Sequence, residues 1–360
     1  MLTHRTTYGL ALSVLAAACS LELTQPIAAT ELETSERGGF TPDGKFYAIG
    51  TKPMGRADSG SWVVNVTRDE SGRYVANDFV AGAFEGTDDG TLRGKPKGEP
   101  CVFSGMAVHG FKLYAACATL EFHASLLEID TQAGTVRAAA FTSCNAEPAK
   151  LPCEPLMFYP NGMSVDAAGR VYLSNTAAHL SFENPDLPAI SVEGSRSITQ
   201  VRIDAAASSA GQLAFTHHDW YSTDILTDGL TPNGIQIEGD TLYYAAGPNI
   251  NRVAIREDGS AGTFGVHYYG PALSYIDDFA VRDGRMALAR TLPPAIVALE
   301  RAPRFGNPRE LGSYAMDLTR IPSSISIQDD IPLGMSLFPS GSLVITCYFG
   351  GGLWVLAEDP

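Results

Sequence analysis

The sequence predicts an all-β fold, a six-bladed β-propeller with four antiparallel strands in each blade. One observation is a unit of two strands with period-2 alternation, joined by a turn that contains Gly, which recurs along the chain. Another is that the 3.6-residue periodicity of helices is nearly absent beyond the N-terminal segment. The third is composition, because 36 Gly and 22 Pro supply the many tight turns that such a fold needs.

The recurring unit is clearest in "YPNGMSVDAAGRVYLSN" (159–175) and "TPNGIQIEGDTLYYAAG" (231–247). Looser copies are "ERGGFTPDGKFYAIG" from Glu36, "FSGMAVHGFKLYAACA" from Phe103, "IDDFAVRDGRMALAR" around Asp277 and "PLGMSLFPSGSLVITCYFG" around Leu333. Six copies over roughly 330 residues give about 55 residues per unit, which is the size of a propeller blade with its loops. An all-β sandwich or a pair of barrels is the alternative, and the ordered repetition disfavours it.

The N-terminal stretch "MLTHRTTYGLALSVLAAACS" has a basic start and an apolar run that ends in small residues. We therefore expect an export signal within residues 1–29, cleaved after Ala18 or Ala29, and a single propeller domain over residues 30–360. The protein would be periplasmic or secreted. A weak lipoprotein box makes lipid anchoring at Cys19 the alternative. No other segment approaches the ~18 apolar residues of a spanning helix, so we expect no transmembrane helix.

The net charge indicates which classes of partner are expected, and the cysteine spacing indicates which disulfide bonds and metals are expected. The net charge of −15 argues against nucleic acid and is compatible with cation binding. A small-molecule substrate and a monomer are expected. Cys144 and Cys153 bracket a short loop and predict a disulfide bond, while Cys117 is expected to remain a buried thiol. No Cys or His spacing indicates zinc.

If the strand after each Pro-Asn-Gly is innermost in its blade, the residues just before these strands surround one mouth of the central channel. These residues are Ser104, Asn161, Asn233, Asp277 and Leu333. Asn and Asp at such positions also cap turns. However, a ring of amide and carboxylate oxygens suits a hard cation such as Ca²⁺, and the absence of imidazole and thiolate disfavours zinc or copper.

With these motifs the chain resembles the calcium-dependent six-bladed propeller hydrolases, namely the gluconolactonase/regucalcin (senescence marker protein) and paraoxonase (arylesterase) groups, with strictosidine synthase more distant. The resemblance implies one Ca²⁺ at the channel mouth, held by Glu36, Asn161, Asn233 and Asp277. The local motif "TSERGGFTPDGKFYAI" places the first ligand on Glu36, whereas counting back from Phe46 by the spacing of later blades gives Arg37.

The same resemblance implies further roles and departures. Asp278 matches an additional ligand of the paraoxonases. The acidic ligands of their second calcium would fall at Arg37 and Gly162, so we expect a single metal. Their catalytic His would fall at Ser104, which favours a gluconolactonase-like mechanism that depends on an Asp.

These residues predict an exported hydrolase that opens lactones or cleaves activated esters. A bound cation polarises the carbonyl, and Asp277 or Asp278 accepts a proton from water as general base. The Gly-x-Ser-x-Gly motif of serine hydrolases is absent from the sequence. An isomerase, lyase or condensing enzyme on the same fold, or a binding propeller, are the alternatives.

Five residues are candidates for substrate contact at the mouth. Ser104 belongs to the ring, Tyr159 and Tyr275 precede ring residues, and His217 and His218 are expected on a loop before Asn233. The alternative is a structural role without substrate contact, in which the tyrosines pack in the core and the histidines lie on an exposed polar loop.

Overall fold

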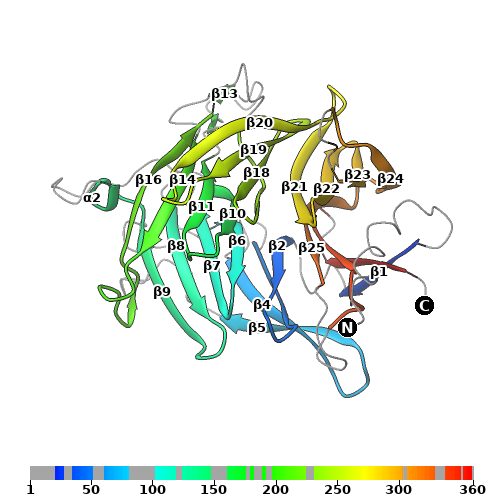
Figure 1. Ribbon diagram of the computed structural model, residues 1–360. Coiled ribbons are helices and arrows are strands. Elements are labelled where there is room, and N and C mark those ends of the chain that lie inside the picture. Colours follow the sequence, from blue (N-terminus) through cyan, green and yellow to red (C-terminus); the bar gives the residue numbers. More distant parts are fainter. Residues whose placement is uncertain are drawn as a thin grey trace, which may run out of the picture.

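The structure is a computed structural model. It describes residues 21–27, 35–51, 61–80, 102–118, 124–146, 160–175, 179–181, 189–191, 197–223, 231–301, 303, 306–328, 337–349 and 352–358. The described strands form six blades that follow one another around a central channel in chain order (Figure 1). The predicted six-bladed propeller of four-stranded antiparallel sheets is thereby confirmed.

The first three blades contain residues 35–222, and their strands are given from the channel outward. The first is β2 (Ser35–Phe40), β3 (Phe46–Thr51), β4 (Ser61–Arg68) and β5 (Tyr74–Val80). The second is β6 (Val102–His109), β7 (Lys112–Ala118), β8 (Ala124–Asp130) and β9 (Thr135–Ala140), with β15 (Gly211–Gln212) parallel to β9. The third is β10 (Pro160–Val165), β11 (Val171–Asn175), β14 (Ser197–Ile203) and β16 (Phe215–Ser222).

The last three blades contain residues 235–358 and one strand from the N-terminal region. The fourth is β17 (Ile235–Glu238), β18 (Thr241–Ala246), β19 (Asn249–Ile255) and β20 (Ala261–Tyr269). The fifth is β21 (Tyr275–Arg282), β22 (Arg285–Leu292), β23 (Pro294–Leu299) and β24 (Glu310–Ala315). The sixth is β25 (Ile321–Ile327), β26 (Leu343–Phe349), β27 (Leu353–Glu358) and β1 (Leu21–Ile27).

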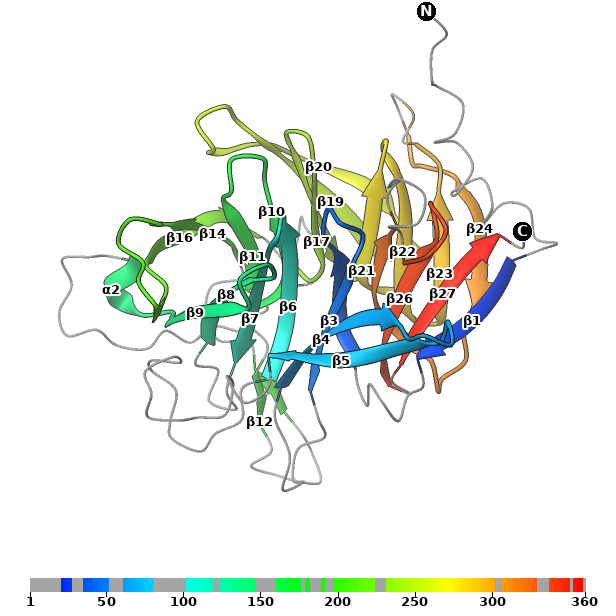
Figure 2. The same cartoon turned by 90° about the horizontal axis from the view of Figure 1, so that it is seen from below.

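Three short elements lie outside this scheme. A single helical turn, α2 (Ser143–Ala146), follows the second blade. The hairpin of β12 (His179–Ser181) and β13 (Ala189–Ser191) lies between β11 and β14 and projects from the blades (Figure 2). Among the described residues, no helix is long and apolar enough to cross a membrane.

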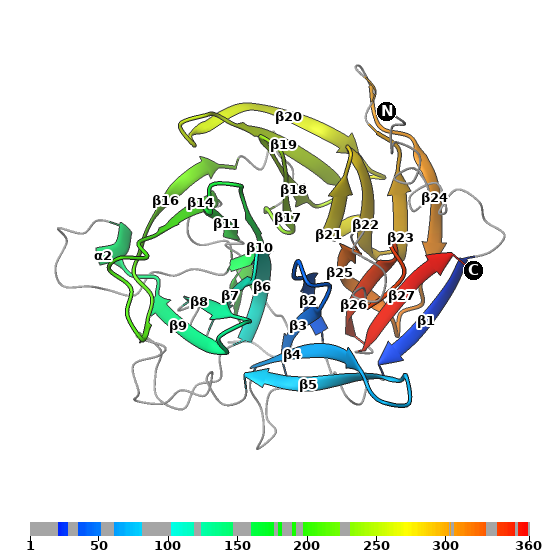
Figure 3. The same ribbon diagram turned by 60° about the horizontal axis from the view of Figure 1, so that its bottom comes forward.

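The sixth blade closes the ring with strands from both ends of the chain. β1 pairs antiparallel with β27, from Leu21 opposite Glu358 to Ile27 opposite Leu353 (Figure 3). β1 lies inside the segment 1–29 in which we expected the export signal. Cleavage after Ala29 would remove this strand, whereas cleavage after Ala18 would leave it in place.

The core consists of apolar clusters between neighbouring blades, so both faces of each sheet are buried. On β3, Phe46 and Ala48 pack toward the sixth blade, while Tyr47 and Ile49 pack toward the second. Burial of both faces removes the polar half of the period-2 pattern. This explains why the second strands of the blades read as continuous apolar runs, such as Lys112–Ala118.

The innermost strand of the sixth blade differs from the sequence prediction. The sequence placed it near Leu333, which lies outside the described residues, but β25 is innermost and β26 follows it. β25 is rich in serine, and its buried hydroxyls are satisfied by a neighbour. Ser323 Oγ and Ser324 Oγ lie 2.9 and 2.8 Å from Thr346 Oγ1.

The cysteines also differ from expectation in one respect. Cys144 is disulfide-bonded, and its expected partner Cys153 lies outside the described residues. Cys117 is disulfide-bonded too, so the expectation of a buried thiol there was wrong. Among the described cysteines the buried thiol is that of Cys347, and burial raises its pKa to about 12.

Candidate functional site

Three of the predicted site residues, Glu36, Ser104 and Asp277, lie at β-bulges near the starts of the inner strands. In β2 the pairing skips Glu36, between Ser35 opposite Gly50 and Arg37 opposite Ile49. In β6 it skips Ser104 in the same way, and in β21 it skips Asp277. A bulge leaves one residue out of the ladder and redirects its side chain. The backbones of these three residues therefore occupy equivalent positions in their blades.

The third and fourth blades repeat this irregularity at the Asn residues. In β10 the pairing is interrupted between Pro160 and Met163, a span that includes Asn161. Before β17, the N–H of Asn233 and the carbonyl of Gly234 both bond to Ala245, at 2.8 and 2.9 Å. The recurring Pro-Asn-Gly is therefore the sequence signature of a bulge at the start of an inner strand.

The glycines of these bulges bring neighbouring blades into backbone contact. A Cβ placed on Gly105 would lie 2.2 Å from the carbonyl oxygen of Asn161, and one on Gly162 would lie 2.2 Å from that of Asn233. A Cβ on Gly234 would lie 2.3 Å from Oδ1 of Asp278. No side chain fits at such distances. Each glycine thus sets the ring residue of one blade directly beside that of the next.

Asn233 and Asp277 are joined by a hydrogen bond. Nδ2 of Asn233 donates to Oδ1 of Asp277 at 2.6 Å and to the hydroxyl of Tyr275 at 3.0 Å. These two contacts use the amide nitrogen and fix the orientation of the amide group. Oδ1 of Asn233 is buried and has no hydrogen-bond partner among the described residues. The amide therefore presents an unused acceptor beside the Asp277 carboxylate.

Asp278 lies behind the ring and faces a buried arginine. Nη1 of Arg37 is 3.4 Å from Oδ1 of Asp278, and the exposed fractions of the two side chains are 8% and 4%. Nη2 of Arg37 donates to the carbonyl of Ile235 at 3.1 Å. The sequence treated Arg37 as a competing position for the first ligand. In the structure Arg37 is aligned with the ring glycines, one residue after Glu36.

The two adjacent carboxylates carry more negative charge than Arg37 offsets. Burial, together with the charge of Asp278, raises the pKa of Asp277 to about 7. Burial raises the pKa of Asp278 to about 6, while Arg37 opposes that rise. Neither oxygen of Asp278 has a hydrogen-bond partner within the part of the chain that the structure describes. A buried carboxylate pair with one cation favours uptake of a second positive charge.

Of the other ring positions, Asn161 and Ser104 contribute oxygen atoms, whereas the structure describes only the backbone of Glu36. Asn161 is partly buried, and Oγ of Ser104 is buried without a hydrogen-bond partner in the part of the chain that the structure describes. The backbone of Glu36 belongs to β2, but its side chain lies outside the described residues. Among the described side chains, no three His, Cys, Asp or Glu residues come together. The described oxygens that a cation would meet therefore come from Asn, Ser and the Asp pair.

Only some of the residues predicted to contact substrate lie near the channel mouth. Tyr275 contacts Asn233, and burial together with Asp277 raises the pKa of its hydroxyl to about 12. Tyr159 lies outside the described residues. The placement of His217 and His218 on a mouth loop was wrong, because both belong to β16, the outermost strand of the third blade. There His217 packs against Phe141, with ring centroids 5.3 Å apart.

Comparisons with known proteins show the fold alone. No protein-family model and no curated protein matches the chain. Two solved structures superpose over most of it. A streptogramin B lyase has a TM-score of 0.50 and 12% identity, covering 94% of this chain and 98% of its own. A luciferin-regenerating enzyme has a TM-score of 0.50 and 10% identity, covering 94% and 95%. Enzymes are therefore among the proteins with a similar fold.

Proposed function

We propose that the protein is an exported, calcium-dependent hydrolase that opens lactones or cleaves activated esters at the channel mouth. The observation that carries this proposal is the set of buried oxygens without hydrogen-bond partners at the ring. Among the described residues, Oδ1 of Asn233 and Oγ of Ser104 have no hydrogen-bond partner, and buried polar atoms in that condition cost free energy unless a ligand satisfies them.

The donor set fits a hard divalent cation. Asn161, Asn233 and Asp277 would hold the ion, with Glu36 as the ligand from the first blade. Amide and carboxylate oxygens are the ligands that Ca²⁺ prefers. When bound, the ion supplies Lewis acidity that polarises a carbonyl group.

Three side chains would orient the catalytic carboxylate, accept a proton and compensate charge. Asn233 holds the carboxylate of Asp277 through Nδ2, so that the carboxylate keeps one orientation. Asp277 is more exposed than Asp278 and is the group placed to accept a proton from an attacking water. Arg37 fixes Asp278 beneath the ring and keeps part of its charge compensated.

Export is supported by the disulfide-bonded state of Cys117 and Cys144, because disulfides persist in oxidising compartments. The N-terminal sequence with its basic start and apolar run agrees with this location.

The test is hydrolysis of a panel of lactones and aryl esters by the purified protein, measured untreated, after a chelator, and after calcium is restored. We expect activity that the chelator abolishes and calcium restores. Activity that resists the chelator would contradict the metal mechanism. No turnover in any state would contradict the hydrolase assignment and favour a lyase, an isomerase or a binding propeller.

A further inference from the structure

Tyr275 is the first residue of β21, and its hydroxyl contacts the ring. Nδ2 of Asn233 donates to this hydroxyl at 3.0 Å and to Oδ1 of Asp277 at 2.6 Å. The tyrosine oxygen is the acceptor in the first contact, so that contact does not use the hydroxyl hydrogen. No described residue accepts this hydrogen. The other ring hydroxyl, that of Ser104, belongs to the second blade. Tyr275 therefore places an unused O–H donor directly beside Asp277.

Tyr275 and Asp277 are the more exposed members of this hydrogen-bonded group. Asn233 is buried, whereas the other two residues are only partly buried. Leu292 lies opposite Tyr275 in the ladder between β21 and β22, and Leu273 belongs to the loop before β21. Both leucines are exposed. A molecule that enters the mouth over the fifth blade therefore meets the hydroxyl and the carboxylate beside apolar side chains, where a hydrogen bond is stronger than in bulk water.

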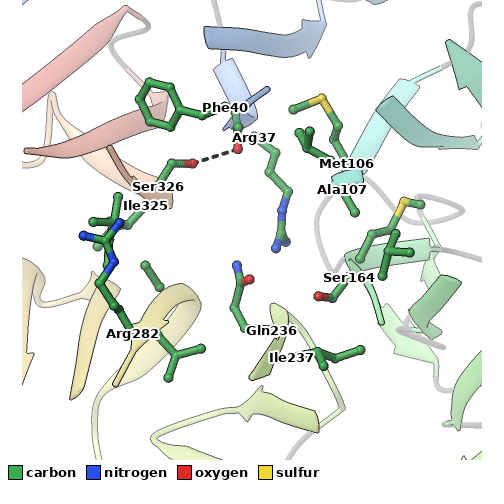
Figure 4. A pocket seen from close by; sticks show the side chains of 18 residues that line it. Arg37, Phe40, Met106, Ala107, Ser164, Gln236, Ile237, Arg282, Ile325 and Ser326 are labelled. Atoms are coloured by element: carbon green, nitrogen blue, oxygen red, sulfur yellow. Dashed lines mark hydrogen bonds between the residues drawn. The ribbon is translucent and has the colours of Figure 1, made fainter. Parts of the chain in front are cut away.

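The arginine beneath the ring serves other groups. There the channel encloses a cavity of about 300 Å³, into which Arg37 extends from β2 toward Gln236 (Figure 4). Nη1 of Arg37 lies 3.4 Å from Oδ1 of Asp278, and Nη2 donates to the carbonyl of Ile235. The guanidinium is thus engaged on the channel side of the ring. On the mouth side, Tyr275 is the donor that lies next to the proposed general base.

The hydroxyl and the carboxylate are held at a spacing that suits a carbonyl group. Two acceptors of one planar amide nitrogen at these bond lengths lie about 5 Å apart. This separation leaves room for a water molecule on Asp277 and for a carbonyl oxygen within hydrogen-bond reach of Tyr275. As the water adds to the carbonyl carbon and gives a proton to Asp277, the electron pair of the C=O bond moves onto its oxygen. A phenol O–H that faces this oxygen stabilises the charge that develops there.

We propose that the Tyr275 hydroxyl donates a hydrogen bond to the carbonyl oxygen of a neutral ester or lactone bound at the channel mouth. Its effect on rate rests on the proposed function, because the bond stabilises an oxyanion only if water attacks that carbonyl. The binding contact does not, because any small carbonyl compound at the mouth can accept the same bond. Tyr275 is then a catalytic residue, and Asn233 orients its hydroxyl through Nδ2.

The first test is calorimetric titration of the purified protein with δ-valerolactam in excess calcium. The lactam presents the carbonyl group of a six-membered lactone and resists hydrolysis. We expect saturable binding that Tyr275→Phe weakens about fivefold, as the loss of one neutral hydrogen bond does. The control Tyr269→Phe removes an exposed hydroxyl at the end of β20 and should leave the affinity unchanged. No saturable binding to the wild type, or equal affinities for the wild type and Tyr275→Phe, would overturn the proposal.

The second test separates a direct contact from an effect through Asn233, because Tyr275→Phe also removes the acceptor of one Asn233 N–H. A direct contact predicts that kcat on lactones falls about 100-fold, whereas KM rises less than about tenfold and calcium affinity stays within about threefold of the wild type. If calcium affinity falls as much as kcat, Tyr275 acts only through Asn233 and the proposal is overturned. Tyr275-dependent lactam binding by a protein that turns over no lactone would support this hydrogen bond and contradict only the hydrolase proposal.

Discussion

Asn233 donates a hydrogen bond from Nδ2 to Oδ1 of Asp277 over 2.6 Å, and this contact joins the fourth blade to the fifth at the channel mouth. The bond determines which atom of the amide remains available. Because the nitrogen is used by Asp277 and Tyr275, the amide oxygen is the atom that finds no partner among the described residues. An amide oxygen and a carboxylate are the kinds of ligand that Ca²⁺ takes, so under the proposed function this pair would supply two of its ligands.

The first prediction concerns the charge of Asp277. Asp277→Asn keeps the shape of the side chain and removes its negative charge, so calcium affinity should fall by about 100-fold or more and hydrolysis should be lost. Calorimetric titration with calcium measures the affinity. Asp283→Asn is the matched control, because Asp283 lies in the turn at the far end of the same strand. Equal affinities in the two variants would remove Asp277 from the ligand set.

The second prediction concerns the close contact between blades. Gly162→Ala would place a methyl group 2.2 Å from the carbonyl oxygen of Asn233, and backbone cannot move away as a side chain can. We expect the free energy of unfolding to fall by about 3 kcal/mol, the upper range for overpacking. Urea denaturation measures this change.

The control for this prediction is Gly265→Ala in β20. A Cβ there meets only the Arg252 side chain, at 3.6 Å, and the backbone has no left-handed φ. Its free energy of unfolding should change by less than about 0.5 kcal/mol. If the two variants are equally stable, the blades are less tightly joined at the ring than the structure indicates.

These contacts show what the sequence could predict. The fold was predictable because each blade repeats the same apolar strands. The positions of Asn161 and Asn233 were predictable because a Pro-Asn-Gly recurs with them, and that of Asp277 because the same strand pattern follows it. A repeated motif therefore predicts the strands within one blade. It also predicts which residues occupy equivalent positions in neighbouring blades.

The rest depended on contacts that do not repeat. Arg37 meets Asp278 across the channel, from the first blade to the fifth, and no local pattern encodes that pair. β25 was missed because its serines make a buried strand look polar in the sequence. Their burial is explained by hydrogen bonds to Thr346 on β26, which lies far away in the sequence. His217 and His218 were misplaced because an outermost strand exposes alternate polar residues and resembles a loop in sequence.

The third prediction concerns processing of the N-terminus. We expect the mature protein to begin at or before Cys19, because β1 supplies the outer strand of the sixth blade. A chain that begins at residue 30 would leave β27 as an unpaired edge and should unfold at a lower temperature than one that begins at Cys19. Mass spectrometry of the exported protein identifies the first residue. A mature chain that starts at residue 30 with unchanged melting temperature would show that β1 is dispensable.

The fourth prediction concerns the pH dependence of stability and rests on His267 in β20. The side chain is buried, neither ring nitrogen has a hydrogen-bond partner among the described residues, and the ring packs edge-on against Tyr243 at 5.0 Å. Burial, with the nearby charge of Arg252, lowers the pKa of His267 from 6.5 to about 4. The folded protein therefore keeps this imidazole neutral where the unfolded chain protonates it.

The sign of the effect follows from this difference. As pH falls below 6.5 the unfolded chain takes up the proton first, so the free energy of unfolding decreases until about pH 4, where the folded protein also binds it. The full loss is about 3 kcal/mol by the usual conversion of a pKa difference. His267→Phe should remove this part of the pH dependence, whereas His109→Phe, at a partly exposed position in β6, should retain it. Urea unfolding at several pH values between 4 and 7 measures both, and parallel profiles for the two variants would show that His267 does not destabilise the protein in acid.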